Sequence, residues 1–224
     1  MMESQLNQKI IAIVGGTGKE GKGLAYRWAL AGHKVIIGSR NFEKAQAAVE
    51  ELKVMLHGKG DITGADNQTA VDACEIAVIT VPYAAHQAIL EELKETLLAK
   101  LIIDVVVPLN PPKVTRVSMP PEGSAALQAK AILGEGAKVT CAFNNISYER
   151  LLSGEEVDCD VLVCGNSKEA RQLVIGLVED TGLKAWDAGP LENSMVVEGL
   201  TSILIGLNIQ YKVPSSGIRI TGIN

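Results

Sequence analysis

The sequence predicts an α/β fold in which helices cover both faces of a doubly wound, parallel sheet. Strand-like apolar runs alternate with helical stretches along the 224 residues, which is the order that produces a parallel sheet. The runs at residues 76–81 and 101–107 are almost entirely apolar, as expected for strands buried on both faces. A glycine-rich turn joins the first run, residues 10–14, to the first helical stretch.

The first half of the chain is regular. The first helix ends at Gly32, and the second is rich in Ala, Glu and Leu. Asp66 or Asn67 is a suitable N-cap for a short third helix, and Pro82 breaks the fourth strand. The strands expected here are 9–14, 34–38, 62–65 and 76–81, and the helices are 19–31, 42–56, 67–74 and 84–99.

The second half is less regular. After the strand at 101–107, residues 108–123 contain five prolines and show neither a helical nor a strand period. A loop of that length is uncommon unless it is functional or mobile. Ser124 is the expected cap of the next helix, and residues 150–160 give a mixed pattern. The remaining expected strands are 138–143, 161–164 and 183–187, and the remaining helices are 124–133, 167–180 and 191–211.

The glycine-rich turn has the spacing of a dinucleotide site. Gly16, Gly18 and Gly21 fit G-x-G-x-x-G between a strand and a helix. In that context the first glycine permits the tight turn, the second admits a pyrophosphate and the third lets the helix pack on the strand. Free N–H groups in the first turn of the helix, which holds Lys19 and Glu20, then face the phosphates. The alternative is a tight turn that binds nothing.

The end of the second strand favours NADP over NAD. An NAD site usually places a carboxylate about 20 residues past the glycines to hold the ribose hydroxyl, but this strand ends in Gly-Ser-Arg. Arg40 is a permanently charged donor that suits a phosphate, Ser39 adds a hydroxyl, and Lys44 and Thr17 can reach the same group. The alternative is that Arg40 merely ends a strand in solvent.

The predicted dinucleotide-binding part accounts for only the first two thirds of the chain. We expect a Rossmann-type NADP-binding domain at residues 1–145 and a small C-terminal α/β part at residues 146–224. The C-terminal part ends in a long helix with a broad apolar stripe, residues 195–207. This stripe either packs on the sheet or forms the interface of a homodimer.

Composition excludes several classes of function. The net charge of −5 and the lack of a basic tract argue against nucleic acid. The four cysteines show no metal-ligand spacing, and Cys141 and Cys164 fit small core residues. The first ten residues lack the apolar core of a signal peptide, and the run at 195–209 is too short to span a bilayer. We expect a cytoplasmic protein without a metal site or membrane partner.

Ligands of a parallel sheet lie beyond the carboxyl ends of its strands. Here those ends carry the glycine turn, Ser39-Arg40, Val81-Pro82, Val107-Pro108 and residues 144–147. No acid, base or nucleophile stands out. His86 either reaches this cleft or is a partly exposed helix residue. An alcohol dehydrogenase needs a proton shuttle, whereas hydride transfer between two ring cofactors mainly needs two apposed rings.

Several segments resemble a known family. IAIVGGTGKEGKGLAYRWALAGHKVIIGSR, IAVITVPYAAH, CAFNNIS and DAGPLENSMVVEGLT are together similar to NADPH-dependent reductases of the deazaflavin coenzyme F420. The resemblance implies a Rossmann domain with a small C-terminal part and direct hydride transfer between NADPH and F420. It also implies that the NADP phosphate site is formed by Thr17, Ser39, Arg40 and Lys44.

The second cofactor is less defined. Residues 144–147 read Asn-Asn-Ile-Ser where some members of the family carry His-Thr-Ile-Pro. Related domains serve in metalloreductases that use an ordinary flavin. The alternatives are therefore a reductase of a flavin, a metal or a small carbonyl compound, or a non-catalytic NADP sensor. The expected cofactor-binding residues are Gly16, Thr17, Gly18, Lys19, Glu20, Ser39, Arg40, Lys44, Val81, Pro82 and Asn144, and no catalytic residue is expected.

Overall fold

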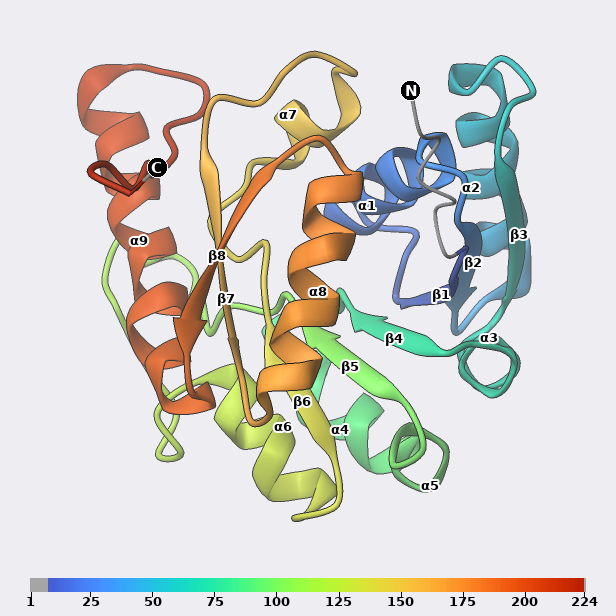
Figure 1. Cartoon of the computed structure of the whole chain (residues 1–224), viewed down its shortest axis with the longest axis horizontal. Coiled ribbons are helices and arrows are strands. Elements are labelled where there is room, and N and C mark those ends of the chain that lie inside the picture. Colours follow the sequence, from blue (N-terminus) through green and yellow to red (C-terminus); the bar gives the residue numbers. More distant parts are fainter. Residues whose placement is uncertain (1–7, 224) are drawn as a thin grey trace.

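The computed structural model describes residues 8–223 and shows one eight-stranded sheet with helices on both faces (Figure 1). The strand order is β3-β2-β1-β4-β5-β6-β7-β8, and β6–β7 is the antiparallel pair. The predicted α/β fold class is confirmed. The strands are β1 Ile10–Val14, β2 Lys34–Ser39, β3 Asp61–Asp66, β4 Ile76–Ile79, β5 Leu101–Asp104, β6 Lys138–Cys141, β7 Asp160–Gly165 and β8 Lys184–Gly189.

The helices lie in two layers. The α-helices are α1 Lys19–Leu30, α2 Phe42–Met55, α3 Asn67–Ala73, α4 Tyr83–Glu92, α5 Lys94–Leu97, α6 Ala125–Leu133, α7 Tyr148–Leu152, α8 Lys168–Asp180 and α9 Ser194–Tyr211. A 3-10 turn, Leu191–Asn193, precedes α9. Side chains alternate across each strand, so Ile11 and Ile13 join the core beneath α1, α2 and α8, whereas Ala12 and Val14 join the core beneath α3, α4 and α6.

Some element boundaries differ from the prediction. The helix expected at 84–99 is interrupted at Leu93, which separates α4 from α5. β4 and β5 end at Ile79 and Asp104, before the expected 81 and 107. At β5 the reason is a tight turn in which Asp104 Oδ1 accepts the N–H of Val106 at 3.0 Å. The mixed stretch at 150–160 contains the end of α7 and the first residue of β7.

Strands from both sides of the expected boundary near Asn145 belong to one sheet. Thr140 pairs with Gly165 and Cys141 with Cys164, and both cysteines are buried, as expected. The division into residues 1–145 and 146–224 stays a prediction. Residues 1–7, on which most of the leader-peptide argument rests, and residue 224 lie outside the described part. Within that part, no helix is both long and apolar enough to cross a bilayer.

Candidate functional site

The turn after β1 admits only glycine at several positions. Gly15 has φ +72°, so it and not Gly16 supplies the left-handed residue. A Cβ on Gly16 would lie 2.8 Å from the carbonyl oxygen of Ile13, and one on Gly21 would lie 2.6 Å from Gly16 Cα. The expected close packing of α1 on the strand is therefore present.

Gly18 is different. A Cβ there would meet only Gly15 O, at 3.8 Å, so no protein atom requires glycine at this position. Gly18 is the N-cap of α1 and has no side chain to bond the free N–H groups of the first turn. The start of α1 is thus open to a bound anion, and the missing side chain leaves room for one.

The turn forms one wall of a cavity of about 440 Å³ at the carboxyl ends of β1, β2 and β4. Most of the expected binding residues line it, but Gly16 and Asn144 do not. Those lining it are Thr17, Gly18, Lys19, Glu20, Ser39, Arg40, Lys44, Val81 and Pro82, and the residues not foreseen are Gly15, Asn41, Asn67, Thr80, Ala85, Ala88, Ile89 and Glu92.

One end of the cavity is cationic. Arg40 and Lys44 are both exposed, and among residues 8–223 no carboxylate lies within ion-pair distance of either side chain. Asn41 caps α2 by accepting the N–H of Lys44 at 2.8 Å, and Ser39 Oγ accepts the N–H of Asn41 at 3.2 Å. These caps fix the backbone and leave two positive charges available to a phosphate.

Beyond β6 the chain turns sharply. Phe143 has φ +64°, unusual for a bulky residue, and its ring packs edge-on against Trp28 with the centroids 5.5 Å apart. The turn buries Asn144, whose Nδ2 donates to the carbonyl of Val106 at 3.1 Å. Thr201 of α9 donates to the carbonyl of Asn144 at 2.7 Å. Sequence reasoning missed Phe143 and Thr201, although Thr201 ends the DAGPLENSMVVEGLT segment.

Two buried side-chain oxygens in the described residues lack a hydrogen-bond partner, Glu20 Oε1 and Asn144 Oδ1. Glu20 is half-buried, and burial raises the pKa of its carboxyl group to about 8. Buried polar atoms without a partner are rare in folded proteins. Both belong to expected cofactor-binding residues. Glu20 also lines the cavity, so its free oxygen fits a polar ligand there.

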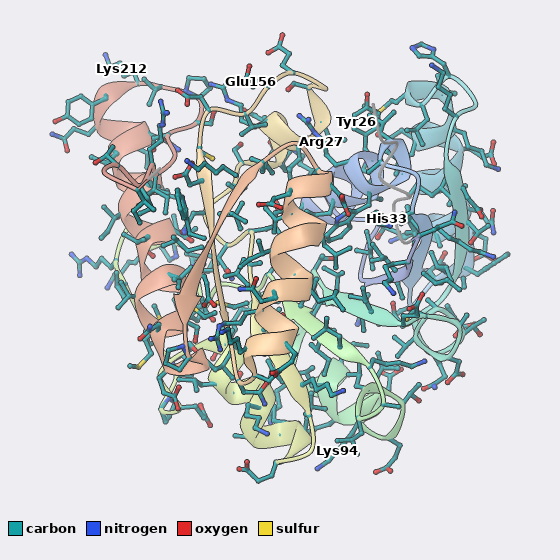
Figure 2. All side chains as sticks on the ribbon, in the orientation of Figure 1. Tyr26, Arg27, His33, Lys94, Glu156 and Lys212 are labelled. Atoms are coloured by element: carbon teal, nitrogen blue, oxygen red, sulfur yellow. The ribbon has the colours of Figure 1, made fainter. Side chains whose placement is uncertain are left out.

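The expected alternatives for His86 are both wrong, because this side chain is fully buried. Its Nε2 lies 2.7 Å from Asp104 Oδ2, on the core side of α4, away from the cavity. His33 is structural, with Nε2 3.0 Å from Asp180 Oδ2 (Figure 2 labels His33). Hence neither histidine supplies an acid or base to the cavity.

Helix α1 is hydrogen-bonded to α7 and to the residues that follow it, in the second half of the chain. Arg27, labelled in Figure 2, donates to the carbonyl oxygens of Leu151, Arg150 and Glu155 at 2.8, 2.9 and 2.7 Å. Gly23 fits against Leu151, since a Cβ on it would lie 2.8 Å from that side chain. These contacts hold the glycine turn at a fixed distance from α7.

Comparisons with known proteins agree with this geometry. Residues 10–108 match the model of a family described as NADP oxidoreductase, coenzyme F420-dependent. The F420-dependent NADP reductase of Methanocaldococcus jannaschii is 42% identical over 221 residues, which cover 95% of this chain and 98% of that protein. The chain belongs to the family of F420-dependent NADP reductases.

More distant matches extend beyond that family. A solved structure from Arthrobacter sp. FB24, named as a candidate F420-dependent NADP-reductase, shares the fold with a TM-score of 0.79. It is 24% identical, and the match covers 96% of this chain and all of that one. Metalloreductase STEAP3 of Rattus norvegicus is 27% identical over 89% of this chain, which spans 37% of that longer protein.

Proposed function

We propose that this member of the F420-dependent NADP reductases transfers a hydride between NADP(H) and the deazaflavin coenzyme F420. The observation that carries the proposal is the cavity, where a glycine turn meets the available charges of Arg40 and Lys44. The name of the relative that is 42% identical over nearly its whole length supports the second cofactor.

The residues divide among the parts of NADP(H). Arg40 and Lys44, which form the cationic end, bind the 2′-phosphate, and the hydroxyls of Ser39 and Thr17 line the same cavity and add hydrogen bonds to it. The pyrophosphate lies over Gly16 and Gly18 at the start of α1, beside Lys19 and Glu20. Val81 and Pro82, at the end of β4, line the part of the cavity that receives the nicotinamide.

Coenzyme F420 then approaches from the side of Asn144 and the proline-rich loop. The loop packs along α9, where Ser202 Oγ donates to the carbonyl of Arg116 at 3.4 Å. It contains a second hollow of about 510 Å³. Bound NADP(H) and F420 supply the redox chemistry, and the protein orients the two rings and excludes water.

The test is direct. Purified protein mixed with NADPH and oxidised F420 should bleach the deazaflavin absorbance, and NADH at the same concentration should bleach it far more slowly. An unchanged absorbance with saturating NADPH contradicts the proposal.

The match to a metalloreductase favours one second candidate, reduction of a flavin or ferric compound. Turnover of ferric chelate or flavin without turnover of F420 would select it. Tight NADPH binding without turnover of any acceptor would instead indicate a sensor.

We further propose that the protein is a cytoplasmic homodimer. All four cysteines are free thiols, as is usual in a reducing compartment.

Apolar side chains project from α9 into solvent: Met195, Val196, Ile203, Leu207 and Ile209. A second copy covering this surface would explain them. Light scattering after gel filtration should give twice the chain mass, and Ile203→Glu should reduce it to one chain.

A further inference from the structure

We propose that Glu20 carries a proton within the cofactor cavity, being neutral when NADPH is bound and a carboxylate when NADP⁺ is bound. This inference rests on the proposed NADP(H) site. It starts from an imbalance in the reaction: NADPH, a deazaflavin and one proton give NADP⁺ and the reduced deazaflavin. The hydride leaves NADPH as an electron pair with its hydrogen, so a ring nitrogen of the deazaflavin must acquire a proton from elsewhere.

Glu20 is the carboxyl group best placed for this. It lines the 440 Å³ cavity from the first turn of α1. In a helix, residues three and four apart share a face, so Glu20 lies on the side of Gly23, which packs against Leu151 of α7. Glu20 therefore lines the cavity beside the pyrophosphate, on the face of α1 that is turned toward α7 and the side from which F420 approaches.

No protein group fixes the charge of Glu20. Its Oε1 is shielded from solvent and has no hydrogen-bond partner in residues 8–223, and no cation in that range lies within ion-pair distance of it. Lys19 is engaged with the hydroxyl of Tyr148 at 3.0 Å. The charged or titratable groups around the cavity and on α7 are Lys19, Arg40, Lys44, Glu92, Tyr148, Glu149 and Arg150, and the guanidinium of Arg150 bonds Ser215 Oγ at 2.8 Å.

The cofactor's own charge then sets the protonation state. Burial alone already raises the pKa of Glu20 to about 8, so near neutrality the group holds its proton. The anionic pyrophosphate at the same helix end raises the pKa further, because like charges disfavour ionisation. Loss of hydride makes the nicotinamide cationic, which lowers the pKa again. The proton is thus released when the reduced deazaflavin requires it, and solvent later replaces it.

The experiment counts protons and does not depend on turnover. Calorimetric titrations of NADPH and of NADP⁺ into the protein, at pH 8 in buffers of different ionisation enthalpy, give the protons bound with each cofactor. The NADPH complex should hold more protons than the NADP⁺ complex, by up to about one per chain. Titration of the 2′-phosphate is common to both cofactors and cancels in this difference.

Two variants test the assignment. Glu20→Gln keeps the shape but cannot ionise, so the difference between the two cofactors should vanish while both still bind. Glu43→Gln is the matched control, because Glu43 occupies the first turn of α2 but is exposed, and its difference should equal that of the unaltered protein. Equal proton counts for NADPH and NADP⁺ in the unaltered protein, or a difference that persists in Glu20→Gln, overturn the inference. Failure of both cofactors to bind would overturn the proposed function instead.

Discussion

Two groups of buried polar side chains lie behind the strand ends, and they differ in how completely they are bonded. In the first, the His86 network, His86 bonds Asp104, and Glu198 accepts the N–H groups of Ala125 and Ala126 at 2.7 and 3.1 Å. In the second, the Glu20–Asn144 pair, each side chain has one buried oxygen without a partner in the described residues.

The more completely bonded group, the His86 network, connects several elements of the fold. Each polar group of the His86 network has a partner supplied by another element, and Gln128 Oε1 of α6 lies 3.3 Å from His86 Nδ1. The network therefore joins α4, β5, α6 and α9. Burial lowers the pKa of His86, but the Asp104 carboxylate outweighs this and raises it overall. The side chain of Asn144, by contrast, bonds through Nδ2 alone. The chain itself satisfies the polar groups of the His86 network, whereas Glu20 and Asn144 each keep one oxygen without a protein partner, which fits their proposed roles in cofactor binding.

The largest effect is expected when the His86 network is broken. His86→Ala removes the partner of a fully buried carboxylate, which should lower the free energy of unfolding by about 3–5 kcal/mol. Urea titration measures it. Gln87→Ala, one residue along and exposed, should cost less than about 0.5 kcal/mol. Equal losses in the two variants would mean that the network does not stabilise the fold.

His86 also shows where sequence reasoning ends. The glycine turn, the cationic strand end and the alternation of strands are local patterns, so the fold class and nine of the 17 residues that line the cavity could be predicted from them. The bond from His86 to Asp104 and the contact of Glu198 with α6 join residues that only the folded sheet brings together. Phe143 gives no sign in the sequence of its left-handed turn. The cofactor roles of the lining residues stay predictions.

The next largest effect concerns the cavity and not the fold. Arg40→Ala removes charge-assisted hydrogen bonds to the 2′-phosphate, so NADPH binding should weaken by about 1.5–3 kcal/mol, with NADH binding and urea stability unchanged. Fluorescence or calorimetric titration gives the dissociation constants. Lys53→Ala, in the last turn of α2, the helix that follows Arg40, should change neither. A similar loss for both cofactors would remove Arg40 from the phosphate site.

Replacing Glu20 should have the opposite effect to replacing His86, because it should stabilise the fold at high pH. Its folded-state pKa, about 8, lies above the unfolded value of 4.5, so the folded chain holds a proton that the unfolded chain has lost. Native stability from this group is therefore complete below pH 4.5 and is lost as the pH rises to about 8. Glu20→Gln should match the unaltered protein at pH 4.5 and exceed it by about 1–3 kcal/mol at pH 9. A difference that does not change with pH would contradict the raised pKa.

The smallest effect should come from Thr201, which links the two regions. Its helix, α9, carries Glu198 of the His86 network, while its hydroxyl bonds the carbonyl of Asn144. Thr201→Val keeps the shape and removes a hydroxyl that donates to the carbonyl of Asn144 and to Oδ1 of Asn145. These two contacts share one hydrogen, so stability should fall by only about 0.5–1.5 kcal/mol. NADPH affinity should not change, because Thr201 does not line the cavity.

If Asn144 faces the second cofactor, the Thr201→Val change should raise KM for F420 while NADPH affinity stays constant. Weakened NADPH binding would instead place Asn144 in the NADP site, and unchanged F420 kinetics would make its free oxygen a feature of the fold.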